Sequence, residues 1–241
     1  MKPLTTLAAC AAALAAPLAA WATDFDTLNN LSQAEFALFT KDLGAATSYK
    51  QLASAAPLGV AGFDIAVASA FTNTQYPDLW SKAAGNADIP GTVPVPGIRI
   101  AKGLPFGIDI GATYATLPKV DAKLAGVELR WALLEGGLVS PAVGLRVAAT
   151  KLSGVDQLSL SNASFDVSIS KGFPFITPYA GVGAVRTSAK VNGATTLQSE
   201  SPTQARVFAG LHLNLGLFDI TAEGDKTGKT TSYSARLGFR F

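Results

Sequence analysis

The chain ends in Tyr233-Ser-Ala-Arg-Leu-Gly-Phe-Arg-Phe241, a stretch in which apolar residues alternate strictly with polar or small ones. Tyr233, Leu237, Phe239 and Phe241 share one phase, and the other phase carries two arginines. Successive side chains of a β-strand point to opposite faces, so this stretch predicts a strand with one apolar face and one cationic face. Such a strand suits the wall of a membrane barrel, which has hydrocarbon on one side and a polar interior on the other.

The same alternation recurs upstream, and the alternating segments number ten. Most of them reach the roughly 9 to 11 residues that a tilted strand needs to cross a bilayer. The segments cover residues 60–72, 95–103, 106–117, 122–134, 141–152, 158–171, 175–189, 203–217, 219–226 and 230–241. Longer connections alternate with tight turns along the chain, as in outer-membrane barrels, which have long loops outside and short turns in the periplasm. The longer connections are expected at residues 73–94, 118–121, 153–157 and 190–204.

We therefore predict an all-β fold, in which residues 59–241 form a single antiparallel transmembrane β-barrel of about ten strands. Twelve strands are the alternative. That count requires residues 45–52 to form a strand that pairs with a partner in the first long connection.

The positions of charged residues provide an energetic test, because a lipid-facing Arg or Lys near the bilayer midplane costs about 2 to 4 kcal/mol. In the fourth segment Glu128 and Arg130 alternate with Val127 and Leu129, and most segments separate charge from apolar residues in this way. These residues would form either a self-compensating ion-pair network, which buried charges require, or a selectivity or ligand-binding surface. The charged and polar residues predicted to face the lumen are Asp64, Asp109, Glu128, Arg130, Arg146, Asp166, Arg206, His212, Glu223, Asp225, Arg236 and Arg240.

The seventh segment is ambiguous, because Tyr179 and Val185 favour one phase and Val182 favours the other. Arg186 decides between them, and we predict that it points inward. Aromatic residues are expected in two bands, one near each rim of the barrel, as interfacial girdles require. The outer band comprises Phe71, Tyr114 and Tyr233.

Residues 1–22 have the features of a secretory signal, with Lys2, an Ala/Leu-rich run and a cleavage motif at Ala20-Trp21-Ala22. A transmembrane helix is the alternative. The stretch ending at Cys10 superficially resembles a lipoprotein box, but its apolar core before the cysteine is too short. Since Cys10 is the only cysteine, cleavage before Thr23 would leave no disulfide, thiol nucleophile or Cys metal site.

Residues 23–58 are expected to form an N-terminal periplasmic segment with one short helix. Ser32 and Glu35 make a capping box, and Gly44 suits the position after a helix end, so the pattern predicts a helix over residues 33–43. Two positions are open to this helix: it caps the barrel floor, or it enters the lumen as a plug. Glycines in the inward phase leave space in the lumen for either solute or this segment.

Composition and motifs exclude several classes of function. The 19 basic and 17 acidic residues nearly balance, which gives no electrostatic footprint for nucleic acid. The sequence contains no phosphate-binding loop, dinucleotide fingerprint or cluster of metal ligands, so we expect neither a cofactor nor a metal site. His212 is the single histidine. A pair with Glu223 would be chemically usable, but a lone lumen histidine is more often a member of a hydrogen-bond network, and we expect no enzyme.

The last nine residues also resemble the C-terminal signature of Gram-negative outer-membrane β-barrel proteins, which the barrel assembly machinery reads. In this chain the signature would comprise Tyr233, Leu237, Phe239 and Phe241. The resemblance is to small outer-membrane barrels in general, without a subfamily. It implies an outer-membrane location, with outer-membrane lipid and the assembly machinery as partners, and we expect a monomer.

The function expected of such a barrel is that of a narrow pore or transporter for small solutes, or of a structural membrane protein. The alternative is a surface-exposed binding or adhesion protein that acts through its extracellular loops. Residues 73–94 contain Tyr76, Leu79 and Trp80, which would either contact a partner or pack over the barrel mouth. An outer-membrane enzyme is the third possibility.

Overall fold

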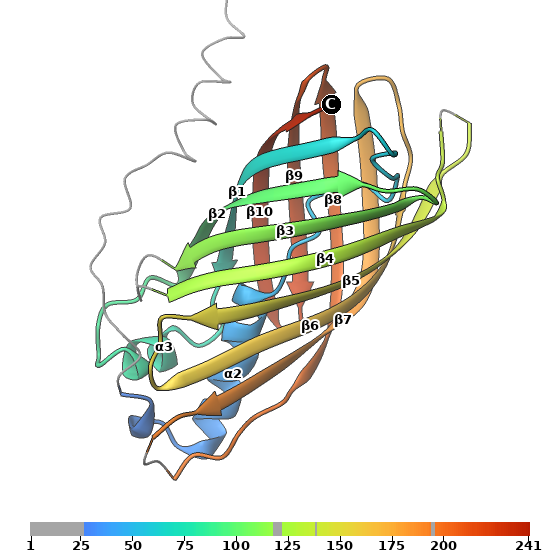
Figure 1. Ribbon diagram of the computed structural model, residues 1–241. Coiled ribbons are helices and arrows are strands. Elements are labelled where there is room, and N and C mark those ends of the chain that lie inside the picture. Colours follow the sequence, from blue (N-terminus) through green and yellow to red (C-terminus); the bar gives the residue numbers. More distant parts are fainter. Residues whose placement is uncertain (1–26, 118–121, 138, 194–195) are drawn as a thin grey trace, which may run out of the picture.

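The structure is a computed structural model that describes residues 27–117, 122–137, 139–193 and 196–241 (Figure 1). The expected secretory signal, with Lys2, Cys10 and the cleavage motif, lies outside these residues, as does the expected connection at residues 118–121.

The strands of the described chain number ten and close into one antiparallel barrel (Figure 1). Each strand pairs with its neighbours in the sequence, and β10 pairs with β1 to complete the wall. The predicted fold class and the count of ten are confirmed, and the twelve-strand alternative is wrong because residues 45–52 form no strand. The strands are β1 (Phe63–Asn73), β2 (Thr92–Gly103), β3 (Ile108–Leu117), β4 (Ala122–Leu134), β5 (Ala142–Ser153), β6 (Leu158–Ser170), β7 (Ile176–Val191), β8 (Thr203–Leu215), β9 (Phe218–Thr227) and β10 (Thr230–Arg240).

The two ends of the barrel differ in their connections. Residues 74–91, 154–157 and 192–202 join strands at one end, which we call the loop end. The connections after β2, β4, β6 and β8 lie at the other end, which we call the turn end. Because β1 starts at the turn end and β10 finishes there, the barrel closes where the chain ends. The backbone of Phe241 exchanges two hydrogen bonds with Phe63 at this seam.

The outer face of the wall is mainly apolar. Val127 on β4, Val182 on β7 and Ile98 on β2 each leave more than half of their surface exposed, and aliphatic neighbours continue this face around the barrel. Exposed aliphatic side chains on every side of a closed barrel are favourable only against hydrocarbon. The strand phases predicted from charge therefore hold for most of the wall.

The prediction for Arg186 is wrong, because its side chain is exposed on the outer face of β7, while Val185 and Thr187 are buried inside. The inner positions of this strand pack against an internal helix, which leaves room only for small or apolar side chains. Arg186 lies in the last third of β7, near the loop end, where a long cationic side chain can extend toward the membrane interface.

The internal helix is α2 (Gln33–Thr47), and it begins with the predicted capping box. Ser32 N–H donates to Glu35 Oε2 at 2.7 Å, and Glu35 N–H donates to Ser32 Oγ at 3.3 Å. The helix continues past its predicted end, so Gly44 lies within it. A side chain at Gly44 would overlap Thr187 of β7, and the glycine therefore permits close approach of helix and wall. Among the described residues, no helix is long and apolar enough to cross a membrane.

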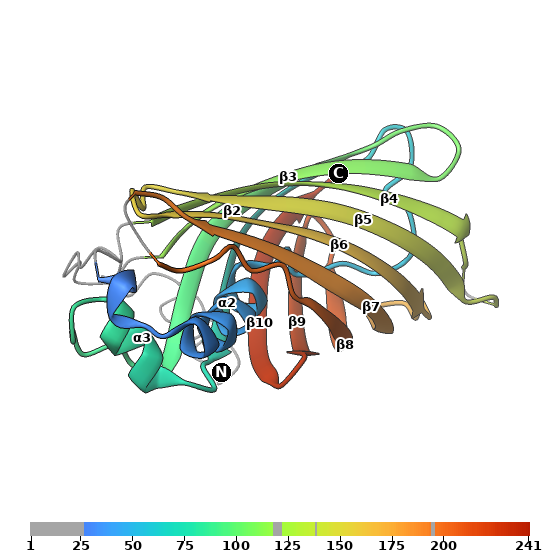
Figure 2. The same cartoon turned by 90° about the horizontal axis from the view of Figure 1, so that it is seen from below.

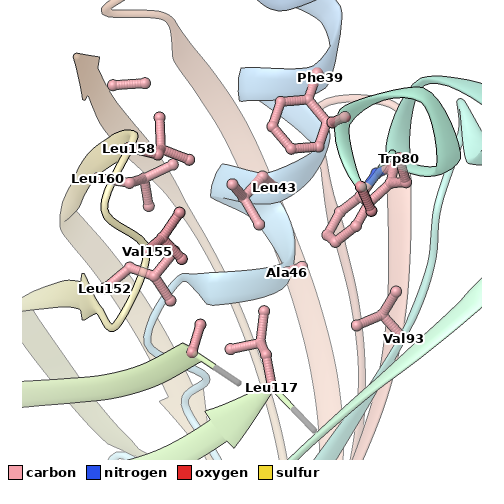
Figure 3. Packing of buried hydrophobic residues seen from close by; sticks show 14 of the residues in the cluster. Phe39, Leu43, Ala46, Trp80, Val93, Leu117, Leu152, Val155, Leu158 and Leu160 are labelled. Atoms are coloured by element: carbon pink, nitrogen blue, oxygen red, sulfur yellow. The ribbon is translucent and has the colours of Figure 1, made fainter. Parts of the chain in front are cut away.

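Helix α2 lies inside the ring of strands at the loop end (Figure 2). The plug is therefore the arrangement found, and the expected cap on the barrel floor is not. Much of the inner wall around the helix is apolar: Leu117, Leu152, Leu158 and Leu160 are buried and face Leu43 (Figure 3). This set of buried residues, which we call the apolar zone, gives the loop end of the lumen a hydrophobic core.

Two further helical turns cover α2 at the loop end, namely η1 (Leu28–Asn30) and α3 (Pro77–Ala83). Trp80 of α3 is buried, packs edge-on against Phe39 at 5.4 Å between ring centroids, and donates from Nε1 to Asp42 at 3.0 Å. Asp42 also accepts from Thr230 Oγ1 at 2.7 Å. The long first connection thus packs over the barrel mouth.

We predict that Val127→Arg destabilises the protein by about 2 to 4 kcal/mol, because Val127 faces outward near the middle of β4. Urea-driven unfolding from phospholipid vesicles measures the change. Thr116→Arg serves as the control, since Thr116 is exposed on the outer face close to the loop end, where an arginine costs only about 0 to 1 kcal/mol. Equal effects of the two substitutions would contradict the membrane position of the wall.

We also predict that the start of α2 keeps its cap in strong acid. The backbone N–H of Ser32 and the ammonium of Lys82 lower the pKa of Glu35 to about 2. A depressed pKa means that the carboxylate adds stability above its ordinary pKa of 4.5, and that this stability is lost as the pH falls through about 2. An NMR titration of the Ser32 amide checks the midpoint. Lys82→Met is expected to raise it, and a wild-type midpoint near 4.5 would disprove the cap.

Candidate functional site

Between the apolar zone and the turn end the inner wall is charged, and residues 48–58 pass through it without regular secondary structure. The described strands contribute seven carboxylates and six arginines to this part of the lumen. We call it the charged zone. Of the predicted lumen residues, Arg240 is half-buried. The others are buried, namely Asp64, Asp109, Glu128, Arg130, Arg146, Asp166, Arg206, His212, Glu223, Asp225 and Arg236.

Most of these wall charges pair with one another. Asp166 accepts from Arg146 Nη2 at 2.6 Å and from Arg206 Nε at 3.0 Å. Glu128 lies 3.3 Å from Arg99 Nη2, and on its other oxygen 3.6 Å from Arg146 Nη1. These charges form one connected network across neighbouring strands, which compensates for their removal from water.

A second group of wall charges lies nearer the turn end. Arg236 donates from Nη2 to Asp64 and to Asp219, both at 2.7 Å. Arg240 adds a contact of 3.0 Å to Asp64, and Arg130 pairs with Asp109 at 3.2 Å. The self-compensating network is therefore the arrangement seen in the wall itself.

Guanidinium groups that pair with wall carboxylates also bind the main chain of the internal segment. Arg206 donates to Tyr49 O at 2.8 Å, and Arg146 donates to Lys50 O at 3.1 Å. Arg99 spans two carbonyls, with Lys50 O at 2.8 Å and Gln51 O at 3.1 Å. Arg236 reaches the next carbonyl, Leu52 O, at 3.4 Å. Four consecutive carbonyls thus each accept from an arginine of the wall, and we call this arrangement the arginine clamp.

Glu223 binds backbone N–H groups of the same stretch of main chain whose carbonyls the arginines bind. Its carboxylate accepts from Gln51 N at 3.2 Å, from Leu52 N at 2.8 Å and from Tyr179 Oη at 2.7 Å. Leu52 has a φ of 46°, in the left-handed region that leucine rarely adopts. A non-glycine residue keeps such a conformation only where its surroundings fix both of its peptide groups.

The internal segment brings one charge of its own into the charged zone. Lys50 lies 2.9 Å from Asp225 Oδ1 and also donates to Ser232 Oγ and Ala45 O, both at 3.0 Å. With Lys50 in place, seven cations face the seven carboxylates of the described strands. The segment therefore completes the charge balance of the lumen.

The remainder of the segment fills the lumen down to the turn end. Ala55 N donates to Ser170 Oγ at 3.1 Å, and Leu58 N donates to Asp109 Oδ1 at 3.0 Å. Two cavities remain beside residues 46–57, of about 50 and 10 Å³. They are sufficient for a few water molecules at most.

His212 does not meet the predicted carboxylate partner. Its Nδ1 lies 2.9 Å from Thr221 Oγ1 and 3.7 Å from Asp219 Oδ1. Glu223 instead contacts the internal segment and Tyr179. The histidine is thus a buried member of the wall network, and the hydroxyl group that its ring bonds belongs to a threonine.

Three charged members of the site were not predicted from the sequence. Arg99 lies between the exposed Ile98 and Ile100, so strand alternation alone marks it as inward. Asp219 likewise belongs to the same phase as Glu223. Lys50 carries no such signal, because it precedes the first strand and its position depends on where α2 ends.

No protein-family model matches the sequence, and no curated protein matches it. Solved structures do match. The N-terminal β-barrel domain of Pseudomonas aeruginosa OprF is 12% identical over 74% of this chain and 97% of its own, with a TM-score of 0.37. The KdgM porin is 8% identical over 74% and 99%, with a TM-score of 0.39, and Neisserial surface protein A is 12% identical over 74% and 94%, with a TM-score of 0.31. The closed barrel of this chain is established by its own strand pairing.

We predict that Arg146→Met loosens the internal segment, because it removes donors from two carbonyls of the arginine clamp and a partner from Asp166. Breaking a buried pair costs about 3 to 5 kcal/mol, which corresponds to at least about two orders of magnitude in exposure of the segment. Cys10 is the only cysteine of the sequence, so Ser54→Cys in a chain of residues 23–241 provides a single reporter, and the rate of its reaction with a thiol reagent measures exposure. Lys226→Met, on the outer face, is the control. An unchanged labelling rate in the Arg146 variant would refute the clamp.

Proposed function

We propose that this protein is an outer-membrane β-barrel closed by its own N-terminal segment, and that it acts as a structural membrane protein. In this proposal no solute passes while residues 28–58 occupy the lumen. The observation that carries it is the arginine clamp, together with cavities of about 50 and 10 Å³ beside it. A lumen bonded to its contents over its whole charged length offers no path for a solute.

The outer-membrane location is part of the same proposal. An apolar outer wall and a charged, enclosed interior support it, because the reverse arrangement would suit water. The C-terminal signature supports recognition by the barrel assembly machinery. Phe239 and Phe241 lie 5.7 Å apart between ring centroids at the closing seam, and Phe218 and Phe63 extend this aromatic group. Outer-membrane lipid and the assembly machinery are the proposed partners of a monomer.

A gated narrow pore is the second candidate, and one observation favours it. The clamp uses main-chain carbonyls, and Lys50 supplies the one side-chain ion pair that the described part of the segment makes with the wall. Withdrawal of the segment would leave most wall charges still paired with each other. The empty barrel would then be lined by charges suited to small polar solutes.

Adhesion through the first long connection is less well supported than either. Trp80 is buried against Phe39, and Leu79 packs against the same core, so the apolar residues of this connection are used in covering the mouth. We also propose that the protein is not an enzyme, because His212 is buried in the wall with Thr221 as its hydrogen-bond partner.

Planar-bilayer recordings test the proposal. We expect no discrete conductance steps from the full chain and clear steps after deletion of residues 27–52. Lys41→Ala, an exposed change on α2, is the matched control and should remain silent. Steps of equal size from the full chain and the deletion variant would contradict closure. Silence of both would remove the gated pore and leave the structural role.

A further inference from the structure

The outer wall of the barrel has a marked asymmetry of charge. Every carboxylate on the described strands is buried in the lumen, whereas several cations are exposed on the outer face. Three of these lie toward the loop end of β5 and β7. They are Lys151, Arg186 and Lys190.

Two of the cations border a hollow of about 220 Å³ on the outer face, which we call the upper hollow. Its hydroxyl groups come from neighbouring strands in register: Ser159 is opposite Lys190, and Ser161 lies between Lys151 and Ser188. Ser199 and Ser201 of the following connection complete it. The lining contains no carboxylate, and the nearby Glu200 faces Gln33 instead. Ammonium and hydroxyl groups without acidic neighbours are suited to a phosphate.

A larger hollow of about 660 Å³, which we call the lower hollow, continues from the upper one toward the membrane interior. The two share Lys151, Ser161 and Ser188. Small outward side chains on adjacent strands create the depression, because larger residues surround them. The small residues are Ala112, Ala125, Ala149 and Ala163. A concave apolar surface of this kind fits a hydrocarbon chain.

The position of the cations along the wall follows from strand register. Tyr114 lies in the row that runs through Ala125, Lys151, Ser161 and Ser188 across β3 to β7. Its ring is half-exposed on the outer face near the loop end, where interfacial aromatic residues mark the level of the lipid headgroups. Both hollows thus lie toward the loop end of the wall, and the lower hollow extends farther from that end along β5, β6 and β7.

We propose that the upper and lower hollows together bind one phosphorylated lipid of the leaflet at the loop end. Lys151 and Lys190 hold its phosphate among the serine hydroxyls, Arg186 adds a third cation, and an acyl chain lies over the small residues below. The proposal depends on the membrane position of the barrel but not on whether the lumen conducts.

Native mass spectrometry of the full-length protein in detergent tests the site, with three probes added separately: diphosphorylated lipid A, phosphatidylglycerol and inorganic phosphate. The test variant is Lys151→Met with Lys190→Met, which keeps the aliphatic stems. Lys226→Met is the matched control, because Lys226 is also an exposed outward cation but lies on β9. Each cation contributes about a fivefold factor to binding of an anionic headgroup, so the double variant should bind about thirtyfold more weakly.

We expect at least one lipid to bind the wild-type protein and the control equally, and the double variant to lose it. The lipid that binds more tightly identifies the source of the phosphate. Ala163→Trp, which fills the lower hollow without altering charge, should weaken lipid binding as well. Equal lipid binding by the double variant and the wild type would overturn the proposal. Inorganic phosphate that binds as well as the lipids would overturn the role of the lower hollow.

Discussion

Charge that is buried in the lumen must be paired, and this constraint determines how the protein is arranged inside. The wall carries more guanidinium donors than its carboxylates can accept, since each arginine presents a planar fork of five N–H groups. Arg99, Arg146 and Arg206 direct their remaining donors to the carbonyls of residues 49–51. Without these carbonyls, donors in an enclosed space would lack partners, and such groups are costly. The internal segment is therefore part of the solution to the wall's own electrostatics.

The two zones of the lumen explain why the internal segment changes conformation at Ser48. Next to apolar side chains a chain must satisfy its own peptide groups, and α2 does so by helical hydrogen bonds. Next to charged side chains a helix would leave the wall donors unused, so the chain opens and offers its carbonyls outward. Thr47 lies at the boundary, where its carbonyl accepts from Thr150 Oγ1 at 2.9 Å. The position at which α2 ends thus follows from the wall around it.

Strand alternation in the sequence predicts the wall well, because each strand has one face in hydrocarbon and the penalty for a misplaced charge is large. It fails where both faces are apolar. Val185 is buried in the lumen and Val182 is exposed on the outer face, so β7 shows no clear alternation and Arg186 was placed on the wrong face. The apolar zone itself was missed for the same reason, since Leu152 and Leu160 face inward near the loop end while charges face inward farther down their strands.

The internal segment was only partly predictable, because its signals are local while its position depends on contacts far away in the sequence. The capping box specifies where α2 begins, but Gly44 suggested a helix end that does not occur. Its small size is needed for the approach to Thr187, and the sequence gives no indication of that distant partner. Lys50 is a similar case, since its role depends on Asp225 across the lumen.

Balance inside the lumen also bears on the surface outside. With Lys50 in place the charged zone carries equal numbers of cations and carboxylates among the described residues, so the interior has no net charge to offer a partner. All the described strand carboxylates are used within it, which leaves the outward cations of β5 and β7 without acidic neighbours on the strands. A membrane leaflet with anionic headgroups supplies the missing countercharge at that level. The requirement that buried charges be paired therefore keeps the strand carboxylates inside the lumen, and it leaves one sector of the outer wall electropositive.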